Sequence, residues 1–266
     1  MLANRLSYIF DLKGPSLPVD TACSASLMAL DLACAGLHRG DCDTAVVASA
    51  NDLSDLEGWV GFSRLGVLSP TGTCSAFDEA ADGYVRSEAS AAVILKPLSR
   101  ALVSSTDTAT SALALTPRSQ ADGDRVYSVI LATASNANGR GMSLVSPSGE
   151  AQQACARAAF QRSGRDPGSA IDLVEAHATG TQVGDATEVN ALGELFFGEL
   201  QRAAPLRIGS VKSAVGHAEL TAGLLSVIKA TLSLVHNVVY PQVNFSTPAS
   251  SIKYVRSRSL TSRWLC

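Results

Sequence analysis

The sequence has no long uninterrupted run of apolar residues, although 46% of its 266 residues are hydrophobic. A helix that crosses a membrane needs about 18 to 20 such residues in a row, so no membrane span is predicted. The first eleven residues include Asn4, Arg5 and Asp11 and lack the apolar segment of a secretory signal. We therefore expect a cytoplasmic protein. A plastid location is the alternative, and no targeting segment is found in this chain.

The chain also lacks a basic excess and any pair of closely spaced cysteines. A net charge of −3 argues against a nucleic-acid partner, which would need a concentrated basic face. The six cysteines form no CxxC pair and have no zinc-finger spacing to a histidine, so neither a metal site nor a disulfide scaffold is predicted. One basic segment, 251–266, is predicted to be a solvated tail; its cations are Lys253, Arg256, Arg258 and Arg263.

Short β-branched runs alternate with longer helical stretches along most of the chain. This alternation predicts an α/β fold with βαβ units and a mostly parallel sheet. The residues between 24 and 38 are apolar on all sides, which is typical of a buried helix, and Gly40 is placed to end it. Further helices are expected at 148–162, 185–200 and 219–235, and extended segments or strands at 16–20, 44–50, 89–95, 126–135, 171–175 and 206–210.

The stretch 98–125 has no hydrophobic periodicity and is rich in Ser, Thr, Ala and Asp, which indicates a linker or a surface insertion. It divides the chain into a first half at 1–97 and a second half at 126–250, followed by the atypical tail at 251–266. The two halves have a similar order of elements, which suggests an internal duplication.

Cys23 lies where an extended run, a tight turn and a helix are expected to meet. Its neighbours in DTACSAS are small enough for a sharp turn. The free N–H groups and the dipole of the helix N-terminus would favour the thiolate, so the pKa of Cys23 is predicted to be low. A lone cysteine is more often buried and inert, but the turn favours a nucleophile. The remaining cysteines lack this setting: Cys34, Cys42, Cys74, Cys155 and Cys266.

Two histidines follow predicted strands in the second half. His177 comes just after 171–175, and His217 follows 206–210. Ligands of open α/β sheets bind at the carboxyl ends of the strands, so both imidazoles are expected to meet Cys23 there. His38 and His236 lie near helix ends, where histidines usually serve as surface cations.

Three motifs resemble the active-site motifs of the β-ketoacyl synthases, and they occur in the family's order. They are DTACSAS around Cys23, EAHATGTQVGD around His177 and KSAVGHAELTAG around His217. The stretches 4–11, 68–86 and 243–248 resemble the modular polyketide subgroup, and the resemblance covers residues 3–250. It implies a thiolase-like, layered α-β-α-β-α fold of two pseudo-repeated halves. The family's first strands and its glycine-rich closing segment are not found, so we expect a fold that is incomplete at both termini.

The resemblance also implies an activity, a decarboxylative Claisen condensation in polyketide or fatty-acid biosynthesis. Cys23 would carry an acyl chain delivered on the phosphopantetheine of an acyl carrier protein, and its backbone N–H would serve as an oxyanion donor. His177 and His217 would hold the carbonyl of a malonyl-type thioester, with Lys212 tuning them. No cofactor or metal would be bound directly. The partners would be the carrier protein, acyl and malonyl-type thioesters and, as in the family, a second copy. Residues expected to support the site are Glu175, Thr179, Thr181, Lys212 and Asp185.

Two alternatives to a condensing enzyme stay open. Small substitutions inside the motifs agree with a catalytically dead fragment that acts as an interaction module; they are Ala25, Ser87, Ala89, Ala178 and Ala186. A Cys–His hydrolase is the other alternative, and it would need an Asn or Asp to orient one histidine. An incomplete fold would expose sheet edges and apolar faces, so poor solubility is expected.

Overall fold

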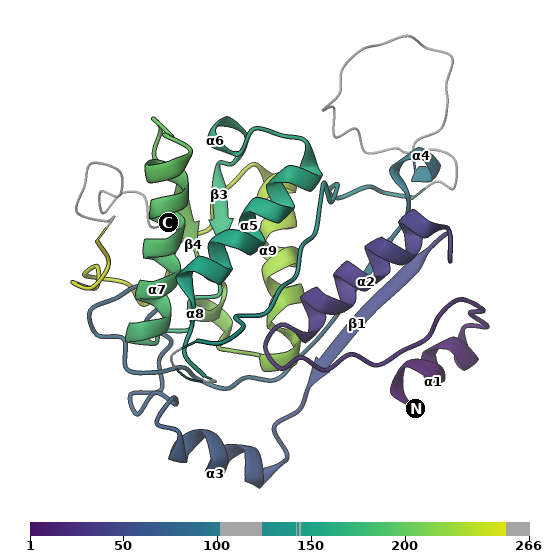
Figure 1. Ribbon diagram of the computed structural model, residues 1–266. Helices are drawn as coiled ribbons and strands as arrows, with labels where there is room; N and C mark the ends of the chain where they lie inside the picture. Colours follow the sequence, from purple (N-terminus) through teal and green to yellow (C-terminus); the bar gives the residue numbers. More distant parts are fainter. Residues whose placement is uncertain (102–123, 142, 144, 254–266) are drawn as a thin grey trace.

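The computed structural model describes residues 1–101, 124–141, 143 and 145–253 (Figure 1). Most of the predicted linker at 98–125 and nearly all of the predicted tail at 251–266 therefore lie outside the described residues. The first residues of the linker form a short helix, α4 (Leu98–Ala101). Among the described residues, no helix is long and apolar enough to cross a membrane.

The first half contains four principal elements, α1 (Leu2–Ile9), α2 (Ala25–Arg39), β1 (Ala45–Asn51) and β2 (Ala89–Leu95). Helix α2 ends as predicted at Gly40, whose φ of 77° allows its N–H to reach the last carbonyls of the helix. Strands β1 and β2 pair antiparallel, with Val47 opposite Val93. The chain leaves β1 through α3 (Leu56–Arg64) and returns to the same end of the sheet (Figure 1). Because a parallel pair needs a crossover to the opposite end, the expected parallel arrangement is wrong for this pair.

The second half contains the parallel pair that the sequence predicted. Strands β3 (Leu173–Glu175) and β4 (Arg207–Gly209) align with Val174 opposite Ile208. The helix expected at 185–200 is divided into α7 (Gln182–Gly193) and a π-helix, η1 (Glu194–Glu199). The remaining elements are α5 (Gly149–Ser163), α6 (Pro167–Ala170), α8 (Lys212–Val215), the 3₁₀ turn η2 (Glu219–Thr221) and α9 (Ala222–His236).

Two segments predicted to be extended are not strands. Residues 16–20 form no ladder. Residues 126–135 instead contact helices: Ser128 and Thr231 of α9 share a hydrogen bond of 3.0 Å, and Arg162 of α5 donates to the Thr133 carbonyl at 2.7 Å. A β-branched run becomes a strand only where a neighbouring strand shares its hydrogen bonds. None of the described segments does so for 126–135, and the strand prediction there is therefore wrong. Residues 16–20, predicted as a short extended run, likewise have no partner strand among the described residues.

Two hydrophobic clusters form the core, and each combines both halves of the sequence. In the first, the loop residue Phe77 packs with Val189 of α7 and Ile208 of β4. In the second, Leu30 of α2 and Val47 of β1 pack with Leu224 of α9. The two halves therefore share their core, although the domain boundaries themselves stay a prediction.

Helix α2 is less buried than its apolar sequence predicted. One face packs against β1 and α9, and α9 approaches so closely that a Cβ on Gly223 would lie 2.5 Å from the Leu27 side chain. Leu27 and Leu32 nevertheless keep 43% and 38% of their surface exposed. The expectation of an entirely buried helix is wrong because no described segment covers this part of its surface.

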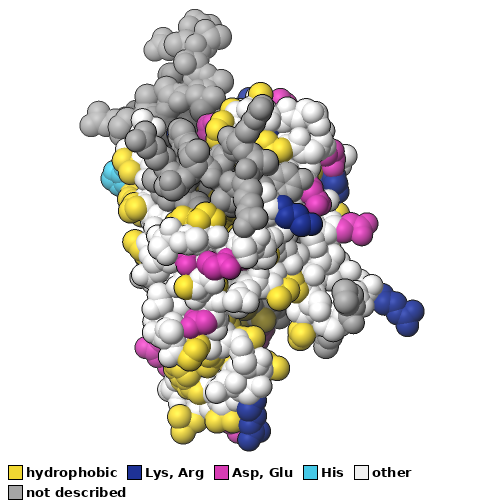
Figure 2. All heavy atoms as spheres, turned by 90° about the vertical axis from the view of Figure 1, so that its left-hand side faces the viewer, with side chains coloured by type: hydrophobic (Ala, Val, Ile, Leu, Met, Phe, Trp, Pro, Cys, Tyr) yellow, Lys and Arg dark blue, Asp and Glu magenta, His cyan; other side chains and the backbone are white. Residues whose placement is uncertain are grey.

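Other apolar side chains are exposed on β1, β2 and α3. The cross-strand pair Val46 and Ile94 is exposed, the latter at 69%. In Figure 2 hydrophobic side chains gather at the lower end of the molecule, where Figure 1 places α3, and Leu56 and Val60 of that helix are both exposed. Large exposed apolar areas favour association.

Candidate active site

Cys23 lies in a sharp turn directly before α2. Ala22 has a φ of 53°, in the left-handed region that a small side chain enters most easily, and its N–H donates to the Asp20 carboxylate at 3.0 Å. The Ala25 N–H donates to the Ala22 carbonyl at 2.9 Å and begins the helix. The turn leaves the Cys23 side chain partly buried at the helix N-terminus.

His217 is held against this sulfur by a short backbone bridge. The His217 N–H donates to the Val85 carbonyl at 2.7 Å, and the Ser87 N–H donates to the His217 carbonyl at 3.0 Å. The imidazole is 1% exposed, and its Nε2 lies 3.1 Å from Sγ of Cys23. The bridge therefore brings together two side chains that are 194 positions apart in the sequence.

The hydrogen bonds of His217 fix which ring nitrogen carries the proton. The backbone N–H of Glu219 donates to Nδ1 of His217 at 3.1 Å, so Nδ1 is an acceptor. In a neutral imidazole the proton is then on Nε2. His217 consequently presents an N–H donor, and not a basic nitrogen, towards Cys23.

His177 completes a group of three side chains. Its ring lies edge to face with that of His217, at a centroid distance of 5.4 Å. The backbone N–H groups of His177 and Ala178 donate to the two oxygens of Glu188, at 2.8 and 2.9 Å, and hold the loop after β3 in place. The structure thus brings together the three predicted residues Cys23, His177 and His217.

Both imidazoles are neutral at physiological pH. Burial, followed by the nearby charge of Lys212, lowers the pKa of His177 to about 4. Burial, Lys212 and His177 lower the pKa of His217 to about 3. His177 remains an exposed residue, whereas His217 is buried. The site therefore offers two neutral N–H donors.

The thiol of Cys23 does not have the low pKa predicted from its position at a helix N-terminus. Burial raises its pKa above the ordinary value, and the carboxylate of Glu219 raises it further, while Lys212 lowers it. The helix dipole favours the thiolate, but desolvation and a neighbouring negative charge outweigh it. Local structure alone therefore predicts the wrong direction for the pKa shift of this thiol.

Lys212, at the start of α8, is the cation of this site and is only 2% exposed. Burial lowers its pKa, whereas the carboxylates of Glu188 and Glu175 raise it. Glu175 also forms an ion pair with Lys229 of α9, at 2.8 Å, and accepts the Val211 N–H. Lys212 is thus surrounded by acids and supplies positive charge to the site without being exposed.

Replacing Lys212 by methionine is expected to destabilise the fold in a pH-dependent way. Glu188 is half-buried, and desolvation raises its pKa above the ordinary value. An acid whose pKa is raised in the folded state contributes stability at low pH, and this contribution is lost as pH rises through the folded-state pKa. Without the Lys212 cation, keeping Glu188 ionised in the folded state becomes more unfavourable. Urea unfolding should therefore show a loss of about 3 kcal/mol in the free energy of unfolding at pH 8, and a smaller loss towards pH 5.

The exposed Lys13 provides the control for this experiment. It pairs with Asp11, and its side chain is 80% exposed. Lys13→Met should change the free energy of unfolding by less than about 0.5 kcal/mol. An equal loss at both pH values in Lys212→Met would assign Lys212 a packing role and contradict the electrostatic one.

The other predicted supporting residues shape the loop and do not contact the sulfur. Asp185 is buried, which raises its pKa to about 6, and it accepts the N–H groups of Phe77 and Gly180 at 2.9 and 3.2 Å. Thr179 and Thr181 share a hydrogen bond of 3.2 Å. Gly180 has a φ of 88°, and a Cβ there would lie 2.9 Å from the Gly83 carbonyl, so only glycine permits this close approach.

Three residues around the site were missed by the sequence analysis, namely Arg86, Glu188 and Glu219. Glu188 is fixed by the backbone of His177, whereas Arg86 and Glu219 form a buried ion pair beside His217. Glu188 lies beside the apolar Val189 on α7, but this helix also carries Asp185 and Asn190, so the sequence gives no specific signal for it. Nothing local distinguishes Arg86 or Glu219 from a solvated charge.

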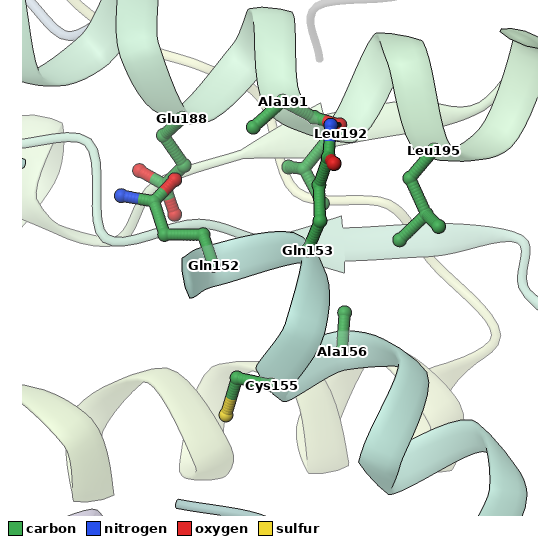
Figure 3. Close-up of a pocket in the computed structure, with 8 residues that line it drawn as sticks. All are labelled: Gln152, Gln153, Cys155, Ala156, Glu188, Ala191, Leu192 and Leu195. Carbon is green, nitrogen blue, oxygen red and sulfur yellow. Dashed lines mark hydrogen bonds between the residues drawn. The ribbon is translucent and has the colours of Figure 1, made fainter. Parts of the chain in front are cut away.

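A cavity of about 240 Å³ lies between α5 and α7, and Glu188 is one of the residues that line it (Figure 3). Gln152 points towards Glu188 from α5, and Cys155 lies further along the same helix (Figure 3). None of the three catalytic candidates lines this cavity. Across the described residues, no cluster of three or more His, Cys, Asp or Glu side chains is placed to hold a metal ion.

Comparison with known families gives two matches that together cover most of the chain. Residues 1–101 match the model of the β-ketoacyl synthase N-terminal domain, and residues 127–246 match that of its C-terminal domain. The chain belongs to the β-ketoacyl synthase family. The candidate site residues lie in both matched regions, Cys23 in the first and the two histidines in the second.

Curated relatives of this ketosynthase chain are polyketide synthases. It is 43% identical to a phenolphthiocerol/phthiocerol polyketide synthase of Mycobacterium tuberculosis, over 97% of the chain and 13% of that protein. It is 42% identical to a non-reducing polyketide synthase of Penicillium canescens, over 91% of the chain and 10% of that protein. The chain therefore spans only a small part of these relatives.

Solved ketosynthase domains share the fold. The oxazolomycin ketosynthase domain of Streptomyces albus aligns with a TM-score of 0.85 and 37% identity, over 95% of this chain and 40% of that one. The ketosynthase from module 6 of the bacillaene synthase of Bacillus subtilis aligns with a TM-score of 0.85 and 34% identity, over 95% and 42%. These neighbours confirm the predicted thiolase-like α/β fold.

Proposed function

We propose that this chain carries the condensing site of a polyketide-type β-ketoacyl synthase. The observation that carries the proposal is the donor arrangement around Cys23: a thiol, a neutral imidazole 3.1 Å away with its proton on Nε2, and a second imidazole beside it. These are the groups that an acyl transfer followed by enolate formation requires. Membership of the ketosynthase family supports the same reaction.

In the first step, Sγ of Cys23 attacks the carbonyl of an acyl thioester. A new S–C bond forms, the thioester C–S bond breaks, and the proton of Cys23 ends on the departing thiol. The raised pKa of Cys23 means that the thiol form predominates at neutral pH. Nε2–H of His217 supports this step by donating to the sulfur as negative charge develops on it.

In the second step, a malonyl-type thioester loses carbon dioxide. Its C–C bond breaks, and the electron pair moves into an enolate whose oxygen is stabilised by N–H groups of His177 and His217. The carbanion then attacks the acyl carbon on Cys23, a C–C bond forms, and the thiolate leaves and is reprotonated. We further propose that the backbone N–H of Cys23 donates to the oxyanion formed in this attack.

The geometry argues against the Cys–His hydrolase. A hydrolase of that type needs a basic imidazole nitrogen facing the cysteine, while the other ring nitrogen donates to an Asn or Asp. His217 has the opposite arrangement, because its Nδ1 accepts the backbone N–H of Glu219. Its pKa of about 3 also makes it a weak base. The thiol of Cys23 and both imidazoles are in place, which favours a working condensing site over a catalytically dead fragment.

The partners follow from the reaction. Acyl and extender groups would be delivered on the phosphopantetheine arm of an acyl carrier protein, so no cofactor would need to be bound in the ketosynthase itself. We extend the proposal to pairing with a second copy, since part of the apolar surface of α2, β1 and β2 is exposed.

The test is to incubate the 266-residue chain with an acyl thioester and then with malonyl-carrier protein. The expected results are an acyl adduct on the peptide that contains Cys23, release of carbon dioxide and a β-ketoacyl product, each detected by mass spectrometry or radiolabel. Adduct formation followed by hydrolysis alone would indicate a hydrolase. Failure to form any adduct in a folded sample would indicate the dead fragment.

A further inference from the structure

Arg86 is a buried cation beside the His217 bridge, and the reaction proposed above gives it no role. The side chain of Arg86 is 6% exposed and that of its partner Glu219 is 13% exposed. Their contact is bidentate, with Nε to Oε1 at 2.5 Å and Nη2 to Oε2 at 3.0 Å. A fork of this kind fixes the carboxylate in direction as well as in distance.

The guanidinium of Arg86 is itself held in place by α3. The rings of Trp59 and Phe62 lie against it, with centroids 4.9 and 5.0 Å from its central carbon. A Cβ on Gly58 would lie 3.0 Å from both terminal nitrogens, so the backbone of α3 also approaches closely. Arg86 therefore links α3 to Glu219 through contacts that leave it little freedom.

Glu219 acts on the catalytic groups in two ways. Its backbone N–H donates to Nδ1 of His217 at 3.1 Å, and its φ of 40° is a strained value for a residue with a side chain. Its carboxylate is the nearby charge that most strongly raises the pKa of Cys23. The position of this single residue thus affects both the histidine tautomer and the sulfur.

We propose that Arg86 is a positioning residue of the condensing site: by fixing and neutralising Glu219, it maintains the donor tautomer of His217 and the reactivity of the Cys23 thiol. The inference rests on the proposed function only in treating this site as catalytic. Arg86 is 133 positions from Glu219 in the sequence, and the pair connects the stretch 68–86 with the motif around His217.

The charges around Cys23 determine the direction of the expected effects. Glu219 disfavours the thiolate form of Cys23, and Lys212 favours that form. Tyr84 is close enough to interact with Cys23, and its ring meets the His217 ring edge to face at a centroid distance of 5.0 Å. His177 is neutral. Removing the charge of Glu219 should therefore make the thiol more acidic, whereas removing Arg86 leaves Glu219 unneutralised and should make it less acidic.

The experiment measures alkylation of Cys23 by iodoacetamide between about pH 6 and 10 in the full chain, followed by mass spectrometry of the Cys23 peptide. Glu219→Gln should move the midpoint of the rate profile to lower pH and raise the rate at pH 7 about threefold to tenfold. Arg86→Met should move the midpoint to higher pH and lower the rate by a similar factor. The double variant should lie between the two.

Opposite shifts of the alkylation midpoint in Glu219→Gln and Arg86→Met distinguish a positioning role from simple loosening of the fold. Loosening would move both midpoints in the same direction. Shifts in one direction, or none, would overturn the inference. Arg157→Met is the matched control, because Arg157 forms an exposed ion pair with Glu199, and its profile should match the parent chain. If Arg86→Met does not fold, Arg86→Gln, which also removes the charge, and the isosteric Glu219→Gln still decide the sign.

Alkylation requires no acyl substrate, so its outcome is independent of the proposed reaction. A chain that shows opposite shifts but forms no acyl adduct would retain the inference about Arg86 and lose the proposed function. A chain that is acylated but shows no shifts would lose only the inference.

Discussion

Replacing Cys23 by alanine is expected to abolish acyl transfer and condensation completely, while a malonyl thioester should still lose carbon dioxide. The variant has no nucleophile to hold the acyl group, so neither an adduct nor a β-ketoacyl product can form. His177 and His217 remain, and their N–H groups can still stabilise the enolate oxygen. Intact-protein mass and release of labelled carbon dioxide measure the two activities separately.

The control for this variant is Cys34→Ala. Cys34 lies on the helix that follows the Cys23 turn and is also partly buried, so its replacement tests whether loss of a thiol on α2 is damaging in itself. The acyl adduct should persist in Cys34→Ala. Persistence of the adduct in Cys23→Ala would instead assign the nucleophile to another residue and contradict the proposed function.

The sequence predicted the parts of the site that depend on local structure. The turn at Ala22, the helix that ends at Gly40 and the strand before His177 all follow from residues close in the chain. The parallel pairing of β3 and β4 then brings the two histidine loops to one edge of the sheet. Convergence of Cys23 with the histidines could therefore be expected before any coordinates were known.

The features that sequence analysis missed all depend on distant segments. Residues 126–135 have strand-like composition, but only a partner strand could have made them a strand. The acidity of Cys23 depends on desolvation and on Glu219, which is brought close by the fold. The contact of Glu188 with the backbone of His177 likewise depends on how α7 lies against that loop. Local propensity contains no information on any of these three features.

Replacing either catalytic histidine by alanine is expected to slow decarboxylation about 10²-fold to 10³-fold, the usual effect of losing one oxyanion donor. Initial acylation of Cys23 should be less affected in His177→Ala than in His217→Ala, because it is His217 that lies within hydrogen-bonding distance of the sulfur. Single-turnover measurements of adduct formation and of carbon dioxide release separate the two steps.

His38→Ala and His236→Ala are matched controls for the histidine variants, because both residues lie in the last turns of helices and no role is proposed for either. Both should retain the parent rates. The pH profile gives an additional criterion: since the pKa values of the two catalytic imidazoles are about 4 and about 3, protonation of a histidine should not limit decarboxylation at neutral pH. A rate that rises through about pH 6 to 7, and loses this rise in His217→Ala, would mean that the imidazole acts as a base. That result would contradict the donor role assigned here and favour a different reaction at the same three residues.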